Sequence, residues 1–131
     1  MKRWMGWVLA GAVLTFAAHA AMSAPMAKAK PAAEKKPQVL MGEIVDTGCY
    51  GSHGARGEKH KECATKCISE GMPMGLLTKD GKLFLLTMNH DNADPYNKAK
   101  TMAASMVAVT GPVVEAGGMR MIEVDDIKPA Q

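Results

Sequence analysis

The sequence predicts a small, mainly β domain with short helices. Three observations indicate this class: apolar runs of strand length, turn residues that separate them, and an Asp-Gly pair between two of the runs. The chain has 131 residues, which suits one domain once a targeting segment is removed.

The amino-terminal part differs in composition from the rest of the chain. Two basic residues precede an apolar run, 4–18, that is short for a membrane span, and a small-x-small site ends at Ala20. Residues 1–20 are therefore predicted to be a cleaved signal peptide, with a retained membrane anchor as the alternative. Residues 21–37 are mostly Ala, Lys and Pro and are predicted to be a flexible linker. We expect a periplasmic or secreted protein without stable membrane insertion after cleavage.

The predicted domain, 38–131, opens with a strand over 39–46. Gly42 inside this strand indicates a bulge or a close approach of two backbones. The glycine-rich residues 50–57 are predicted to be a loop. A helix is expected over 58–70, because acidic residues lie near its start, a lysine lies near its end and a glycine follows it.

The second half of the domain alternates strands with turns. A hairpin is predicted around Asp80 and Gly81, then a short helix over 96–104. Two more strands follow, 106–114 and 119–127, and the first is interrupted by glycine and proline. Five strands in this order predict an OB-like barrel with a Cys/His-bearing helix inserted between strands 1 and 2. An open α+β sheet is the alternative.

The run GEIVDTGCYGSHGARGEKHKECATKCISEGMPMGLLTKDGKLFLL resembles a group of small exported bacterial domains of unknown function. That group has a G-x-[VI]-x-D-x-x-C opening, then a His, a Cys-x3-Cys segment, a Gly and an L-x-x-x-G-K hairpin. The later run VAVTGPVVEAGGMRMIEV is similar to the closing strands of the group. The resemblance implies an exported, OB-like domain, and it implies no established activity.

One segment gathers all three cysteines and two of the four histidines. Cys49 and His53 lie in the predicted loop. His60, Cys63 and Cys67 fall at i, i+3 and i+7 of the predicted helix and therefore share a face. Thiolate and imidazole are ligands of zinc and copper, so these five residues are candidate ligands of a zinc or copper ion.

Other residues bear on this centre. Met72 and Met74 follow the helix, and their thioethers would suit Cu(I). Asp46 is expected either to end the first strand and cap the loop, or to orient a ligating histidine.

A disulfide is the main alternative, because thiols oxidise outside the cytoplasm. Cys49 with Cys63 or Cys67 is the easier pair, and one cysteine would then remain free. Thiol redox chemistry is a further alternative, although the sequence has no Cys-x-x-Cys motif.

The leading interpretation is an exported metal-binding domain, and the second is a disulfide-stapled module that binds an envelope protein. Whether the protein is an enzyme stays open. The residue pattern favours a non-enzymatic role, because it contains neither carboxylates paired for hydrolysis nor a phosphate-binding glycine loop. Residues 38–131 carry ten basic and twelve acidic side chains, which argues against nucleic acid as a partner.

Overall fold

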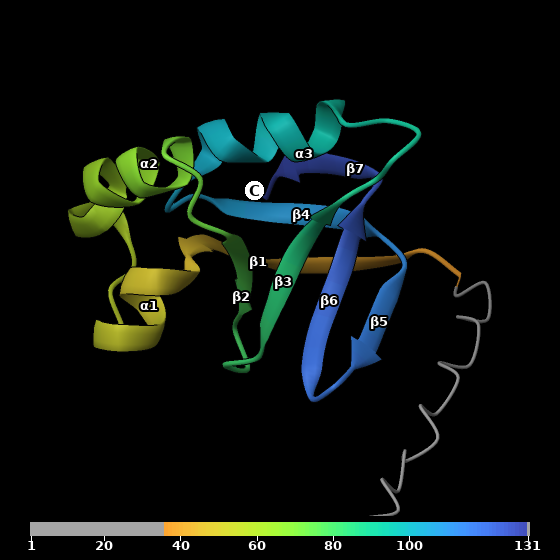
Figure 1. Ribbon diagram of the computed structural model, residues 1–131, viewed down its shortest axis with the longest axis horizontal. Helices are drawn as coiled ribbons and strands as arrows, with labels where there is room; N and C mark the ends of the chain where they lie inside the picture. The colour runs from red at the N-terminus through yellow and green to blue at the C-terminus, as the bar shows by residue number, and fades with distance from the viewer. Residues whose placement is uncertain (1–35, 131) are drawn as a thin grey trace, which may run out of the picture. The chain divides into compact units, whose positions relative to one another are not determined.

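The computed structural model describes residues 36–130, so the predicted signal peptide and nearly all of the predicted linker lie outside the described residues. The described part is mainly β structure with short helices (Figure 1). The helical elements are α1 (Thr47–His53), η1 (Glu58–His60), α2 (Lys61–Ser69), α3 (Asp94–Ala99) and η2 (Lys100–Met102). The strands are β1 (Gln38–Asp46), β2 (Met74–Thr78), β3 (Leu83–Met88), β4 (Met106–Gly111), β5 (Val113–Ala116), β6 (Met119–Val124) and β7 (Asp126–Pro129).

Within the described residues the strands form one sheet in the order β5-β6-β3-β2-β1-β4-β7. β1 is an interior strand and pairs antiparallel with both β2 and β4. β3 and β6 run parallel, whereas β4 pairs with β7 and β5 with β6 in antiparallel fashion. Gly42 lies at a close approach of β1 and β2, since a Cβ there would stand 2.5 Å from the carbonyl oxygen of Leu77. The close approach predicted from the sequence is therefore present.

The sheet has seven strands rather than the five expected, because two predicted strands are each interrupted once. The predicted strand 106–114 divides at Pro112, which has no N–H to donate to a neighbour. The predicted strand 119–127 divides at Asp125. Between these breaks the backbones nearly touch: a Cβ on Gly111 would lie 1.6 Å from the carbonyl oxygen of Glu123.

The predicted loop after β1 was wrong in part, because Thr47–His53 forms helix α1. Capping at both ends explains this helix despite its glycines. The Asp46 side chain accepts a hydrogen bond from the backbone N–H of Cys49, and Gly54 ends the helix in the left-handed region at φ 65°. The predicted 58–70 helix is present as η1 followed by α2.

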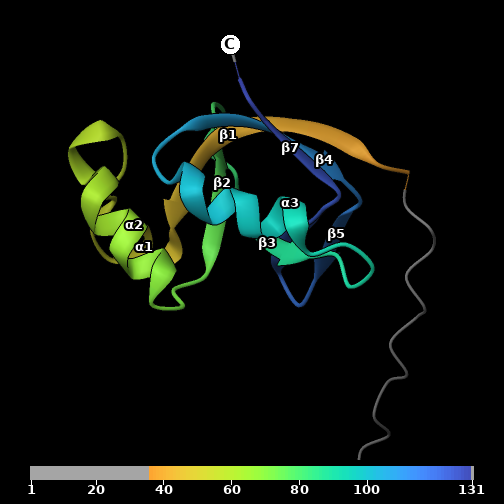
Figure 2. The same cartoon turned by 90° about the horizontal axis from the view of Figure 1, so that it is seen from above.

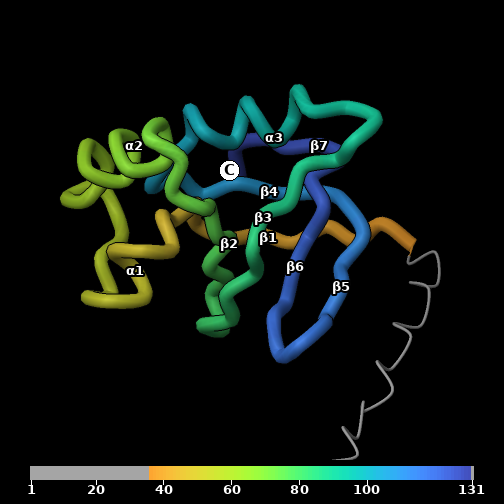
Figure 3. Tube along the Cα trace, in the orientation of Figure 1, coloured from red at the N-terminus to blue at the C-terminus, as the bar shows by residue number. Residues whose placement is uncertain are grey.

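Helices α2 and α3 lie along the same side of the sheet, as the view from above shows (Figure 2). Ala64 and Ile68 of α2 enter the core, where they join apolar residues of β1, β2, β4 and α3. The tube view shows α1 and α2 one above the other beside the start of β2 (Figure 3). No helix within residues 36–130 combines the length and the apolar character needed to cross a membrane.

Candidate metal centre

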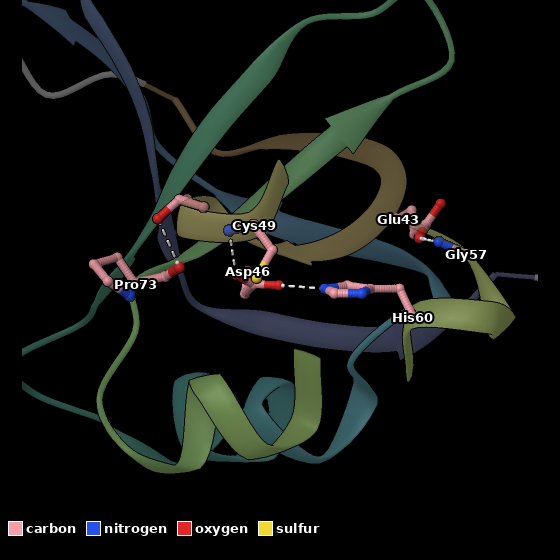
Figure 4. A network of polar contacts seen from close by, with 7 residues as sticks. Glu43, Asp46, Cys49, Gly57, His60 and Pro73 are labelled. Carbon is pink, nitrogen blue, oxygen red and sulfur yellow. Dashed lines mark hydrogen bonds and ion pairs between the residues drawn. The ribbon is translucent and has the colours of Figure 1, made fainter. Parts of the chain in front are cut away.

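Asp46 is the last residue of strand β1 and directly precedes helix α1. The Asp46 side chain is completely buried, and both of its carboxylate oxygens have partners (Figure 4). Oδ1 accepts the backbone N–H of Cys49 at 2.7 Å, and Oδ2 lies 3.2 Å from Nε2 of His60. One carboxylate therefore fixes two of the candidate ligands, which come from α1 and η1.

The loop between α1 and η1 is tied back to β1. The Glu43 carboxylate of β1 accepts a hydrogen bond from the backbone N–H of Gly57, and Gly57 itself has φ 75°. His60 follows at the end of η1, with its ring directed toward Asp46 and 19% of its side chain exposed. When Nε2 of His60 donates to Asp46, Nδ1 keeps its lone pair, as in the carboxylate–histidine–metal arrangement.

The three cysteines converge from two helices. One ligand atom each of Cys49, Cys63 and Cys67 lies within 4.8 Å of the other two. Cys63 and Cys67 directly precede Ala64 and Ile68, the residues that anchor α2 in the core, so packing of α2 sets their position. Cys63 is exposed, while Cys49 and Cys67 are half-buried.

A second set of donors adjoins the first and shares Cys49 with it. Ligand atoms of Asp46, Cys49 and His60 also lie within 4.8 Å of one another. The centre thus offers three sulfur donors, together with a carboxylate and an imidazole near Cys49. Thiolate with imidazole is the donor set of zinc, and thiolate alone suits both zinc and Cu(I).

Two of the thiols hold their protons more tightly than an ordinary cysteine. Burial, then the hydrogen bond to Asp46 and its negative charge, raises the pKa of Cys49 to about 12. Burial, then the hydrogen bond with Cys63, raises the pKa of Cys67. A cysteine nucleophile requires the opposite shift, because the thiolate is the reactive form. The pKa of Cys49 therefore argues against a Cys-His nucleophile, and it means that this thiol would have to lose a proton to bind a metal ion.

The structure brings together four of the five predicted ligands in the two overlapping sets. Cys49, Cys63 and Cys67 form the sulfur cluster, and His60 joins it through Cys49. His53 lies exposed in the last turn of α1, outside both sets. Asp46 takes both roles considered from the sequence, since it caps the chain after β1 and bonds His60. Its place as a donor in the second set was missed, and its position three residues before Cys49 was the available signal.

No protein-family model, curated protein sequence or solved structure matches this chain. The class of site is therefore defined by geometry: a cysteine cluster with an adjacent histidine and a buried carboxylate. The resemblance to small exported bacterial domains stays a prediction.

Proposed function

We propose that this chain is an exported metal-binding domain, non-enzymatic, whose centre is formed by Cys49, Cys63 and Cys67 with His60 as the adjacent donor. The convergence of three cysteine ligand atoms within 4.8 Å supports it most directly. A disulfide needs only two cysteines, whereas a zinc or copper ion can bind all three sulfurs.

The expected OB-like barrel is part of the proposal, and the strand pairing supports it. One residue separates β4 from β5, and one separates β6 from β7. When each pair is counted as one bent strand, five strands remain and their pairings form a closed circuit. The centre then lies on an insertion between the first and second strands of that circuit.

Export is proposed from the amino-terminal sequence. A signal peptide over 1–20 would place the domain in the periplasm or outside the cell. The excess of acidic side chains in 38–131 is consistent with a metal ion or an envelope protein as partner rather than nucleic acid. The resemblance to small exported bacterial domains agrees with this location.

A disulfide-stapled interaction module is the second candidate, and thiol redox chemistry would use the same sulfurs. The proximity of the cysteines favours it too, because a small side-chain rotation would join two of them. A disulfide between Cys49 and Cys63 would close a loop of about 15 residues and would stabilise a small domain by about 3 kcal/mol. A groove of about 430 Å³ beside α1 offers a surface for a partner, and it is lined by Thr47, Pro73, Leu83, Leu85, Gly118, Met119 and Arg120.

The two candidates predict different thiol and metal contents for the mature protein. We would purify it natively, with and without reductant, and measure metal by elemental analysis, intact mass by native mass spectrometry, and free thiols. Metal binding predicts a stoichiometric zinc or copper ion and three thiols protected from alkylation until a chelator is added. Cys63→Ser should lower the metal content, and Thr65→Ser, an exposed change on the same helix, should not.

The metal proposal would be overturned if the reduced protein binds neither zinc nor copper and the oxidised protein contains a disulfide that includes Cys49, seen as a mass lower by two hydrogen atoms. The disulfide-stapled module would then be supported.

A further inference from the structure

Met72 connects the two helices that carry the cysteines. Its backbone N–H donates to the carbonyl oxygen of Cys67 at 2.9 Å, just after α2 ends. Its side chain extends to the residue before Cys49: a Cβ built on Gly48 would lie 2.8 Å from both Sδ and Cε of Met72. The same point is 3.7 Å from Oδ1 of Asp46. The thioether therefore lies beside the start of α1, at the centre's edge.

The neighbouring backbone holds Met72 in this place. Thr47 donates to the carbonyl oxygen of Pro73 twice, from its backbone N–H at 3.0 Å and from its hydroxyl at 3.0 Å. Residues 47–48 and 72–73 are thus side by side, which keeps the Met72 side chain over Gly48. Gly48 leaves room for it, because a Cβ at this position would lie 2.8 Å from Sδ and Cε and would force the thioether to shift.

Burial in the core does not account for the position of Met72. Its side chain is 37% exposed, whereas Met74, two residues later, is buried in the core at 1%. A flexible and partly exposed thioether can swing toward a bound ion at little cost. Thioether sulfur is a ligand for Cu(I) and is not among the usual ligands of zinc.

We propose that Met72 supplies a thioether ligand to the Cys49, Cys63 and Cys67 centre, and that the centre therefore selects Cu(I) over zinc. This inference rests on the proposed metal-binding function. Cu(I) enters without a change in oxidation state, and each thiol that coordinates it releases its proton to solvent.

The first test compares Met72→Leu with Met41→Leu. Leucine matches methionine in volume and removes the sulfur. Met41 is a suitable control because it is exposed and lies five residues before Asp46 on β1, about 16 Å along the strand. Under anaerobic, reducing conditions, the affinity for Cu(I) is measured by competition with bathocuproine disulfonate, and the affinity for zinc by competition with a chromophoric chelator. Met72→Leu should weaken Cu(I) binding about tenfold or more and leave zinc binding within about twofold.

The second test moves the thioether without removing it. Gly48→Ala places a methyl group 2.8 Å from Sδ and Cε of Met72, which is too close for contact and forces the thioether to shift. Gly48 is not in the left-handed region, so alanine fits the helix. The displaced side chain should weaken Cu(I) binding as Met72→Leu does, with an unchanged circular dichroism spectrum. Copper K-edge absorption should also show one sulfur scatterer fewer in both variants.

Each other outcome contradicts the inference in its own way. Unchanged Cu(I) affinity in Met72→Leu means that the thioether is not a ligand. An equal loss for Cu(I) and zinc means that Met72 only shapes the centre. If the wild-type protein binds neither ion, the proposed function fails together with this inference, and the wild-type measurement alone reveals that case.

Discussion

Asp46 organises the centre because its two carboxylate oxygens serve different elements. Oδ1 caps α1 through the N–H of Cys49, and Oδ2 holds the ring of His60. Its complete burial leaves the negative charge poorly hydrated, so the carboxylate also acts on the nearby thiol. The hydrogen bond and the charge of Asp46 are the causes, after burial, of the raised pKa of Cys49.

Asp46→Asn separates the charge of this residue from its capping role. Asparagine caps a helix as well as aspartate does, so α1 should persist. Loss of the charge should lower the pKa of Cys49, although burial will keep it above that of a free thiol. We expect alkylation of Cys49 in the reduced, metal-free protein at pH 8.5 to become about three- to tenfold faster.

Iodoacetamide labelling followed by peptide mass spectrometry measures this rate. Asp126→Asn, which removes a carboxylate from β7, is the control and should leave the rate unchanged. A Cys49 that reacts no faster in Asp46→Asn than in the wild-type protein would mean that burial alone holds the thiol proton.

At the scale of elements, the turn from β4 into β5 depends on one glycine. Gly111 packs against the backbone of Glu123, where no side-chain atom fits. Gly111→Ala should therefore destabilise the fold by about 3 kcal/mol or more, since neither backbone can move without breaking strand pairing. Gly51→Ala in α1 is the matched control, because a Cβ there meets nothing within 4 Å and alanine favours a helix by about 0.5–1 kcal/mol.

Urea denaturation of both variants gives the two free energies of unfolding. The expected signs are opposite, with the midpoint lowered in Gly111→Ala and raised slightly in Gly51→Ala. If Gly111→Ala is as stable as the wild type, the backbones at Gly111 and Glu123 can move apart without a loss of stability.

The elements with strong local signals were predictable from the sequence. The β2–β3 hairpin follows from Asp80-Gly81, and α2 from its charges and the following glycine. Helix α1 was missed because its glycines disfavour a helix, whereas the caps from Asp46 and Gly54 that outweigh them depend on geometry. The sequence predicted an interruption of the 106–114 strand at Gly111 and Pro112, but it did not predict two separate strands there. The backbone of Glu123 approaches Gly111 from a distant part of the sequence, and such a contact has no local signal.

The candidate site was predictable in its donors and less so in its arrangement. The spacing of Cys63 and Cys67 places them on one helix from sequence alone. Which histidine joins them depends on the bond from Asp46 to His60, fourteen residues away in the chain. His60 was preferred from the sequence because it shares a helix face with Cys63 and Cys67, and His53, expected as a substitute or fifth donor, lies exposed in the last turn of α1.

At the scale of the whole molecule, the proposed function implies that a metal ion and protons would compete for the same thiols. The pKa of Cys49 is about 12 in the folded protein and 9.0 for an ordinary cysteine. Below pH 9 the thiol is protonated in both the folded and the unfolded chain, so its contribution to stability is fully present. As the pH rises from 9 toward 12, the unfolded chain loses the proton first, and the reduced, metal-free protein should become less stable.

A bound metal ion should reverse the direction of this pH dependence. Coordination requires thiolate, so protons leave on binding and the affinity should rise between pH 6 and pH 9. An ion present at 100 times its dissociation constant stabilises the folded state by about 2.7 kcal/mol, which corresponds to a rise in Tm of roughly 10–20 °C for a domain of this size. Thermal unfolding of the reduced protein with and without zinc chloride should show this difference increase with pH.

Cys63→Ser provides the control for this pH experiment. The variant loses one of the three sulfur donors, and Cys63 is exposed, so the metal-free Tm should stay close to that of the wild type. The zinc-dependent rise should be reduced at every pH, because the ion retains fewer thiolate ligands. A zinc effect that is the same at pH 6 and pH 9, or unaltered in Cys63→Ser, would show that the ion binds away from the thiols, since only thiol ligation couples binding to the release of their protons.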